Sequence, residues 1–227
     1  MSAAIPNTAQ RPRIQSLSDL IFGLALSISA LTLIGKQPNT TQDLIFSIGL
    51  YAFSFLVLIQ IWRFYSSVTS VLPSEDTLLV DLNILLLFLV SAEPYLFNEL
   101  FAMNGEMLLS LSGIYAIDLA SMFFILAFFY HSLTNEKKQL VPKSLRGRYR
   151  STRNSALVVA LVFAVSVIPY FGLTNVWSFS LGGAQNDLSL RSILWLAGMF
   201  LGWSWRLSEP VFQRRVPLTK DAIRAQV

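Results

Sequence analysis

The stretch RIQSLSDLIFGLALSISALTLIG (Arg13–Gly35) decides the fold of this chain. It contains an apolar run long enough to cross the hydrocarbon core of a bilayer, for which a helix needs about 20 residues. Polar groups nevertheless stand inside it, among them Arg13, Asp19 and several serines. Ionisable side chains are costly within a membrane, so they mark positions with a structural or functional role.

The rest of the chain has the composition of a polytopic membrane protein. Of its 227 residues, 54% are hydrophobic and 13% are charged, whereas a soluble domain has about 25% charged residues. Cysteine is absent and His131 is the only histidine, which excludes a disulfide framework, a cysteine nucleophile and a histidine-rich metal site. The sequence also lacks the H-E-x-x-H and G-x-S-x-G motifs, so we expect neither an enzyme nor a bound cofactor.

Six apolar segments predict an all-α membrane protein with a single transmembrane domain over residues 1–227. The predicted helices cover residues 14–35, 43–65, 78–97, 107–131, 154–173 and 188–208. Pro73 and Ser74 provide a breaker and an N-cap between the second and third helices. The segment GLTNVWSFSLGGAQND (Gly172–Asp187) is rich in Gly and Ser and is expected to be a connection at the membrane interface.

The positions of the basic residues predict the orientation in the membrane. With six helices both termini share one side, and that side carries every Lys and Arg except Lys36 and Arg191. The positive-inside rule makes this side cytoplasmic, so we expect a multi-pass protein of the cell membrane with cytoplasmic N- and C-termini. The basic loop at 137–153 also resembles a lipid- or nucleic-acid-binding patch, but the insertion rule explains it without a nucleic-acid partner.

Four ionisable residues within or at the edge of predicted helices stand out: Arg13, Asp19, Asp81 and Asp118. Asp19 has two interpretations, as a carboxylate that handles protons or ions, or as a structural carboxylate held by neighbouring helices. Ser16 shares its face of the helix. The second and third predicted helices place Trp62, Asp81 and Asn83 at a similar depth. These positions favour a structural polar cluster that joins the first three helices.

A stripe with helical spacing runs along the first predicted helix. Its members are Leu20, Leu24, Ser27, Leu31 and Ile34. The small residues Ser18, Ala25, Ser29 and Thr32 form a neighbouring stripe that suits close helix packing. The leucine stripe is either a packing seam or the lining of a narrow pore in an oligomer, where apolar rings gate by dewetting. Spacing alone does not choose between these interpretations.

The motif R-x-x-S-x-S-D at Arg13–Asp19 resembles the signature of the transmembrane protein 175 family of potassium channels. In that family R-x-x-x-F-S-D opens the first helix, and here Leu17 replaces the phenylalanine. The second helix resembles the family's Y-x-x-S-F…W pattern through Tyr51, Ser54, Phe55 and Trp62. The third and fourth helices add Leu82, Asn83, Pro94 and the sequence IYAID, in which Asp118 replaces the usual asparagine.

One departure from the family lies near the end of the second predicted helix. The family usually has a histidine about three residues after the tryptophan, and here Tyr65 follows Trp62 at that spacing. A tyrosine forms hydrogen bonds but does not titrate near neutral pH as a histidine does. A pH response that the family owes to this histidine is therefore not expected here.

The resemblance implies a homotetramer in which the first helices surround a central pore that conducts K⁺ passively. It implies that Leu24 forms the constriction, that the Ser27 hydroxyl contributes to selectivity where threonine is usual, and that Leu31 adds a second apolar ring. K⁺ would pass near Ser27 without a fixed metal site. These residues belong to the stripe found from spacing, so the pore interpretation is preferred. The polar network, with Trp62 and Asn83 as partners, would comprise Arg13, Ser16, Ser18, Asp19, Trp62 and Asn83.

Two other functions compete with a channel. A secondary transporter or proton-coupled permease would use Asp19 and Asp118 as coupling carboxylates. The sequence shows no internal repeat and no helix broken by Gly or Pro at mid-membrane, which are typical of such transporters. A non-conducting structural or regulatory subunit would keep the packing motifs but would have no need for a hydroxyl beside the apolar ring.

Overall fold

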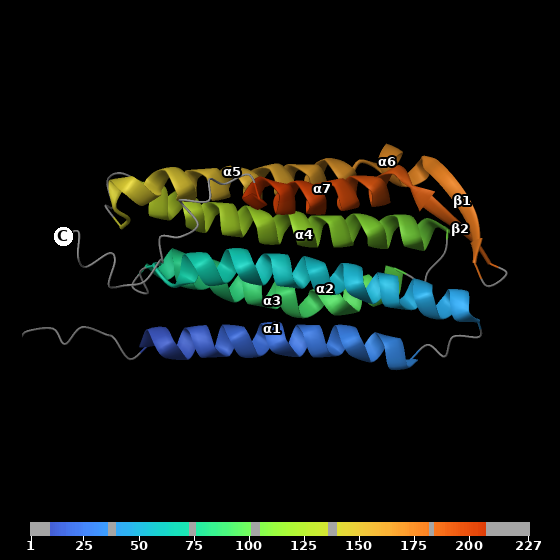
Figure 1. The fold of residues 1–227 in the computed structure, drawn as a ribbon, viewed down its shortest axis with the longest axis horizontal. Coiled ribbons are helices and arrows are strands. Elements are labelled where there is room, and N and C mark those ends of the chain that lie inside the picture. Colours follow the sequence, from blue (N-terminus) through green and yellow to red (C-terminus); the bar gives the residue numbers. More distant parts are fainter. Residues whose placement is uncertain are drawn as a thin grey trace, which may run out of the picture.

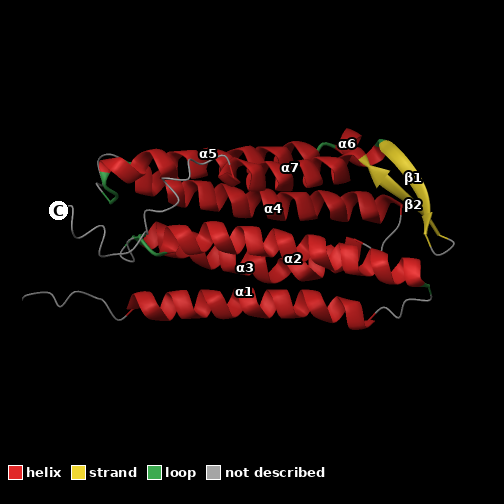
Figure 2. Cartoon of the chain, in the orientation of Figure 1, coloured by secondary structure: helices red, strands yellow, loops and turns green. Residues whose placement is uncertain are grey.

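The computed structural model describes residues 10–35, 40–72, 76–100, 105–135, 140–181 and 184–207. Six of its elements are long helices: α1 (Gln10–Gly35), α2 (Thr41–Thr69), α3 (Thr77–Leu100), α4 (Gly105–Thr134), α5 (Lys143–Ser166) and α7 (Leu190–Leu207). The short helix α6 (Pro169–Leu173) and the strands β1 (Asn175–Leu181) and β2 (Ala184–Ser189) lie between α5 and α7. Figure 2 shows this helical architecture with its single hairpin.

The long helices lie side by side along the longest axis of the molecule, and α1 forms an outer layer (Figure 1). This helix packs against α2 and α3, and α4 packs against α3 and α5, while α7 packs against α5. The start of α1 lies at the same end as the end of α7, and α6 and the hairpin lie at the opposite end (Figure 1). One side of α1 therefore faces the rest of the protomer and the other side faces away from it.

The first four predicted helices are present, and each extends a few residues beyond its predicted bounds. The largest extension is at α2, which continues to Thr69 rather than residue 65. Helix α3 continues through Pro94 to Leu100. By length and composition, three of the described helices are able to span a membrane: Leu44–Thr69, Thr77–Leu100 and Gly105–Thr134, while Gln15–Leu31 is a shorter apolar segment.

The predicted bounds of the fifth helix are wrong at both ends. The helix starts at Lys143 instead of residue 154, so its first turns consist of the basic segment that was expected to be a loop. Pro142 occupies the N-cap, and long Lys and Arg side chains favour helix once they are solvated. The helix ends at Ser166 because Pro169 forces Ile168 into an extended conformation, with φ −54° and ψ 127°.

The expected connection at the membrane interface contains a hairpin, because β1 and β2 pair there in antiparallel fashion over residues 175–189, while the other described elements are helices. Val176, Trp177 and Phe179 are residue types that favour strands. The strands flank Gly182 and Gly183, a pair that is typical of tight hairpins. The sequence signal was therefore present but was interpreted as an interfacial loop.

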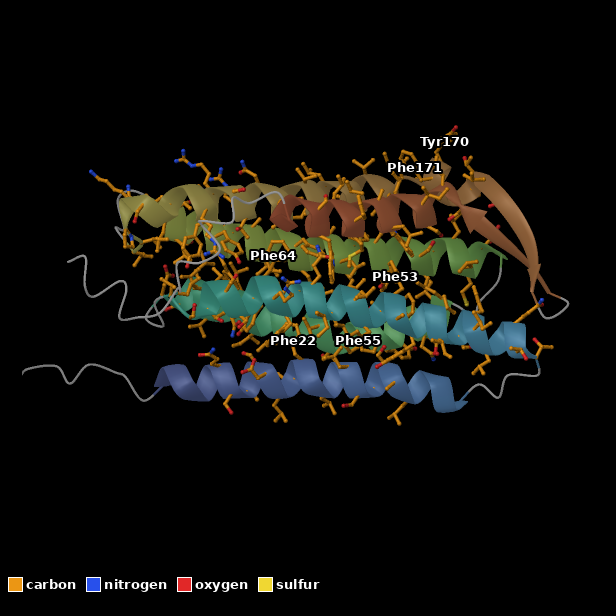
Figure 3. The ribbon with its side chains drawn as sticks, viewed as in Figure 1. Phe22, Phe53, Phe55, Phe64, Tyr170 and Phe171 are labelled. Atoms are coloured by element: carbon orange, nitrogen blue, oxygen red, sulfur yellow. The ribbon has the colours of Figure 1, made fainter. Side chains whose placement is uncertain are left out.

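Aromatic rings hold α4 at the centre of the bundle. Phe64 of α2 meets Phe123 of α4 edge to face, with ring centroids 5.9 Å apart. On the other side Phe123 stacks on Phe163 of α5 at 6.1 Å. Figure 3 shows Phe64 in the layer between α2 and α4. These contacts make α2, α4 and α5 one packed unit, against which α1 is the outer element.

Arg191 is a buried cation at the hairpin end of the bundle. Its Nε donates to the Ser166 carbonyl at 2.8 Å, and its Nη2 donates to the Val167 carbonyl at 3.2 Å. Its Nη1 donates to the Leu109 carbonyl of α4 at 3.0 Å. The guanidinium thus satisfies carbonyls at the C-terminus of α5, where the helix dipole favours a positive charge. Gly172 leaves room for it, since a Cβ there would lie 2.9 Å from Arg191 Cζ.

Replacing this cation should destabilise the bundle. Arg191→Leu removes the donors of several buried carbonyls, each of which costs about 1–3 kcal/mol when unpaired. A change of 1 kcal/mol shifts Tm by about 2–4 °C for a chain of this size. We expect Tm in detergent, followed by loss of the size-exclusion peak on heating, to fall by roughly 5 °C or more. Arg150→Leu, at an exposed position of α5, is the control, and an equal fall in both variants would contradict the capping role.

Candidate functional site

Helix α1 has a buried face made of small and aromatic residues. Ser18, Phe22, Ala25 and Ser29 are at most 2% exposed, and their spacing of four, three and four places them on one side of the helix. Ser18, Ala25 and Ser29 belong to the predicted stripe of small residues, and Phe22 lies on the same face. The burial of these three small residues confirms that the described part of the stripe packs against the rest of the protein. The side chain of Thr32 lies outside the described residues. Figure 3 shows Phe22 pointing from α1 toward the neighbouring layer.

The leucine stripe occupies the exposed face of the same helix. Leu24 is 58% exposed and Leu31 is 59% exposed in the single protomer, and Leu20 and Ser27 are exposed as well. The side chain of Ile34 lies outside the described residues. The stripe is therefore not a seam between helices of one protomer. An apolar face of this kind requires cover from lipid or from another protein surface.

Ser27 is the polar member of this face. Its hydroxyl donates to the Gly23 carbonyl at 2.8 Å, one turn earlier in the same helix. Because the proton points back along the helix, the oxygen lone pairs are left as acceptors on the exposed side. An oxygen acceptor between two leucines is a suitable contact for a partly dehydrated cation.

A polar cluster joins the first turns of α1 to α2 and α3. The Ser18 and Tyr65 hydroxyls are 2.6 Å apart, and the Asn83 side chain also hydrogen-bonds the Tyr65 hydroxyl. Phe22 packs on the Tyr65 ring with centroids 5.4 Å apart. Tyr65, which stands where the family usually has histidine, is therefore the central member of this cluster. In the described part of the chain Asn83 Oδ1 is buried and has no hydrogen-bond partner.

Asp19 and Trp62 form a second contact beside this cluster. The Trp62 indole Nε1 donates to Asp19 Oδ1 at 3.2 Å, and Trp62 is 37% exposed. Ser16 is exposed, and the side chain of Arg13 lies outside the described residues. The structure thus brings together Ser18, Asp19, Trp62 and Asn83 of the predicted network, at the same end of the first three helices.

The sequence interpretation missed Glu93. This glutamate is fully buried on α3 and accepts hydrogen bonds from Ser54 of α2 at 3.1 Å and from Tyr115 of α4 at 3.1 Å. Ser29 of α1 in turn donates to Ser54 at 3.0 Å. The signal was available, since a glutamate inside the predicted helix at 78–97 is an intramembrane carboxylate.

The other ionisable candidates lie apart from the α1 face. Asp118 is 5% exposed on α4, and its Oδ2 has no hydrogen-bond partner among the residues that the structure describes. Asp81 is exposed near the start of α3. His131 lies exposed near the end of α4, with Nδ1 3.4 Å from Arg153 Nη1. Within the described ranges no three or more His, Cys, Asp or Glu side chains gather in a way that could hold a metal ion.

An apolar groove runs between α1 and α3 beside the leucine stripe. Leu24 belongs both to the stripe and to the groove, and Ser91 of α3 is the polar side chain in its wall. The complete lining is Leu17, Ile21, Leu24, Ala25, Ile28, Ile84, Leu87, Phe88 and Ser91. The exposed leucines and the groove thus form one continuous apolar surface on the side of the protomer that carries α1.

The sequence of residues 13–94, which covers α1, α2 and most of α3, matches the family model described as endosomal/lysosomal potassium channel TMEM175. This similarity to the TMEM175 family covers less than half of the chain. The match contains both faces of α1, the Ser18–Tyr65 cluster and Glu93. A comparison with curated protein sequences gave no match.

Two solved structures share the fold of this chain. One is a lysosomal potassium-selective channel TMEM175 homolog from Chamaesiphon minutus, at 16% identity and TM-score 0.55, covering 87% of this chain and 99% of the other. The other is a variant of the potassium channel MtTMEM175 in complex with a nanobody–MBP fusion protein, at 19% identity and TM-score 0.52, covering 94% and 97%. At these identities the likeness concerns the fold.

The Tyr65 cluster predicts a specific loss of stability. Tyr65→Phe keeps the ring on Phe22 but removes the hydroxyl that bonds Ser18 and Asn83. Losing a buried hydrogen-bonding group costs about 1–3 kcal/mol, so Tm in detergent should fall by roughly 5 °C. Tyr95→Phe, at an exposed position of the same bundle, should leave Tm unchanged. A stable Tyr65→Phe protein would mean that the hydroxyl does not hold α1.

Proposed function

We propose that this chain is a subunit of a potassium channel in which K⁺ moves passively through a central pore lined by α1. The observation that carries the proposal is the division of α1 into a packed face and an exposed face with leucines on either side of Ser27. The family match over residues 13–94 supports it, because that segment contains this helix. No cofactor takes part, since the permeant ion is the only ligand that the mechanism requires.

The exposed face of α1 is covered by other copies of the chain in a homotetramer. Lipid covers leucines well, but a hydroxyl with outward lone pairs is better placed beside water or a cation. Four copies of α1 around one axis bring the leucine stripes together and leave the packed faces on the outside, against α2 and α3. The apolar groove between α1 and α3 adjoins the same surface, so it extends the area available for contact between subunits.

Leu24 forms the gate of this pore. A ring of leucine side chains around a narrow axis excludes water, and a pore segment without water is a barrier to ions. Leu31 forms a second apolar ring. Seven residues of helix separate the two rings by about 10.5 Å, at about 1.5 Å per residue.

Ser27 lies between the rings and provides the polar contact for K⁺. It stands about 4.5 Å along the helix axis from Leu24 and about 6 Å from Leu31. Four hydroxyl oxygens at one level replace part of the hydration shell of an ion that the leucines have partly dehydrated. Serine lacks the methyl group and the χ1 stiffness of threonine, so this contact is less rigid than a threonine ring.

The six long helices cross the cell membrane, with both termini in the cytoplasm. The described basic residues of α5 lie at the end of the bundle where α1 starts and α7 ends (Figure 1). Arg63 lies near the same end of α2, over the Trp203 ring at 5.6 Å. Basic residues on one side fit the positive-inside rule, and the buried Arg191 at the other end is used by the helix cap.

Shortening the gate side chain should increase conduction. Leu24→Ala widens the apolar constriction and lowers the barrier that arises from its dewetting. In liposomes with an outward K⁺ gradient we expect K⁺ flux to rise at least about tenfold over the unmodified protein, which corresponds to about 1.4 kcal/mol of barrier. Leu161→Ala, an exposed leucine of α5, is the matched control and should leave flux unchanged.

The same assay separates the channel from its rivals. A channel carries K⁺ only down its gradient, whereas a secondary transporter that uses Asp118 would move its substrate uphill and saturate. Absence of flux from a well-folded oligomer, with and without Leu24→Ala, would refute the channel and favour a regulatory subunit.

Removing the hydroxyl should reduce selectivity. Ser27→Ala eliminates the oxygen acceptor between the leucine rings but keeps the helix and its packing. We expect the ratio of K⁺ to Na⁺ flux to fall by at least about threefold. Ser27→Thr should keep the ratio or raise it, because the hydroxyl remains and χ1 becomes stiffer. An unchanged ratio in Ser27→Ala would show that this hydroxyl does not select the ion.

A further inference from the structure

A line of buried hydrogen bonds crosses the bundle from α1 to α4. Ser29 of α1 donates to Ser54 of α2 at 3.0 Å, and Ser54 donates to both carboxyl oxygens of Glu93 on α3, at 3.1 and 3.2 Å. Tyr115 of α4 donates to Glu93 from the other side at 3.1 Å. All four side chains are at most 2% exposed. The leucine and serine contacts proposed for the pore do not use this line.

The inner end of this line is fixed by the packed bundle. The Tyr115 ring packs edge-on against Trp195 of α7, with centroids 5.1 Å apart, and against Phe97 of α3 at 5.7 Å. Trp195 Nε1 donates to Ser166 Oγ on α5 at 3.0 Å. The carboxyl of Glu93 is therefore held by a network that reaches α5 and α7, and it provides a fixed reference for groups in the outer layer.

The outer end of the line lies on the pore helix, opposite the proposed pore face. Ser29 follows Ser27 by two residues, which is about 200° around a helix. Ser29 also follows Ser18 by eleven residues, which returns to nearly the same side about 16.5 Å further along. Ser18 bonds Tyr65 and Ser29 bonds Ser54, so α1 has two polar attachments on one side, separated by three turns.

We propose that Glu93 is a positioning residue that sets the rotation of α1, through Ser54 and Ser29, and thereby decides which side chains of α1 face away from the protomer. A single attachment would let α1 pivot about it, whereas two attachments on one side prevent both rotation and sliding. The assignment of the outward face to a pore rests on the proposed function. The positioning itself does not, since it concerns contacts within one protomer.

Thiol reactivity measures this rotation directly, because the chain has no cysteine. Single cysteines are introduced as Leu20→Cys on the exposed face, outside the stretch between Leu24 and Leu31, and as Ala25→Cys on the packed face; Leu20 is 68% exposed and Ala25 is 1% exposed. Their rates of reaction with methyl methanethiosulfonate in purified protein give a ratio that reports the orientation of α1. Without further changes we expect Leu20→Cys to react at least about tenfold faster.

Breaking the line should reduce this ratio. Glu93→Leu removes both acceptors, and Ser54→Ala removes the link to Ser29; each should lower the ratio by at least about threefold. Glu93→Gln keeps an oxygen acceptor and should preserve it. Ser155→Ala is the matched control for Ser54→Ala, since Ser155 of α5 is also buried and its hydroxyl has no hydrogen-bond partner among the described residues. Ser54→Ala is a small change that keeps the test valid should Glu93→Leu fail to fold.

The outcomes separate this proposal from the channel. An unchanged ratio in Glu93→Leu and Ser54→Ala overturns the positioning role, and so does a fall in Glu93→Gln as large as in Glu93→Leu. K⁺ flux of the unmodified protein is measured in parallel. Flux together with an unchanged ratio leaves the channel standing and rejects the positioning role. A ratio that falls as expected in a protein without flux supports the positioning role and rejects the channel.

Discussion

One-sided packing of α1 is the constraint on which the rest of the site depends. The helix meets the protomer through small residues, one aromatic ring and two hydroxyl attachments. The leucines and Ser27 on its other side are exposed to a large extent in the described part of the chain. A helix in the middle of a bundle would have no such free face. A helix packed through large residues would stand too far from α2 and α3 for the short Ser18 and Ser29 side chains to reach their partners.

The energies involved indicate that these attachments specify an orientation more than they add stability. Side-chain hydrogen bonds between transmembrane helices contribute about 0.6 kcal/mol on average and up to about 1.7 kcal/mol. Two of them are a small part of the interactions that hold α1. Rotation by one residue, about 100°, would however break both attachments at once and would turn Ser29 out of its contact with Ser54. The free-energy cost of losing these hydrogen bonds therefore opposes rotation of α1 about its own axis, and this rotation decides which side chains face outward.

The sequence predicted those features for which a single signal, such as hydropathy, was sufficient. Hydropathy alone predicted the first four helices. The positions of the residues along these helices then predicted that Asp19 lies near Trp62 and that Ser18 lies at the level of Asn83. Glu93 lies inside the third predicted helix, next to Pro94, but only its contacts with Ser54 and Tyr115 reveal its role. The start of α5 was missed because Arg and Lys suggest a loop when hydropathy is the criterion, yet they are good helix formers. Tyr65 was treated as a departure from a pattern, and only its contacts with Ser18 and Asn83 reveal it as the central member of the cluster.

The buried ionisable groups explain why α1 is able to be an outer layer at all. Arg191 is held by carbonyls of α4 and α5 at the hairpin end, and Glu93 is held by hydroxyls from α2 and α4 near the middle. Both groups are removed from water and instead bind neighbouring backbone or side-chain groups. Removing one of these partners costs more free energy than the contact itself contributes to stability. They consequently resist any rearrangement of α2 to α7. Because this inner bundle is rigid, the contacts of Ser18 and Ser29 with it fix the position of α1. If the partners of these serines moved together with α1, the same contacts would not define its position.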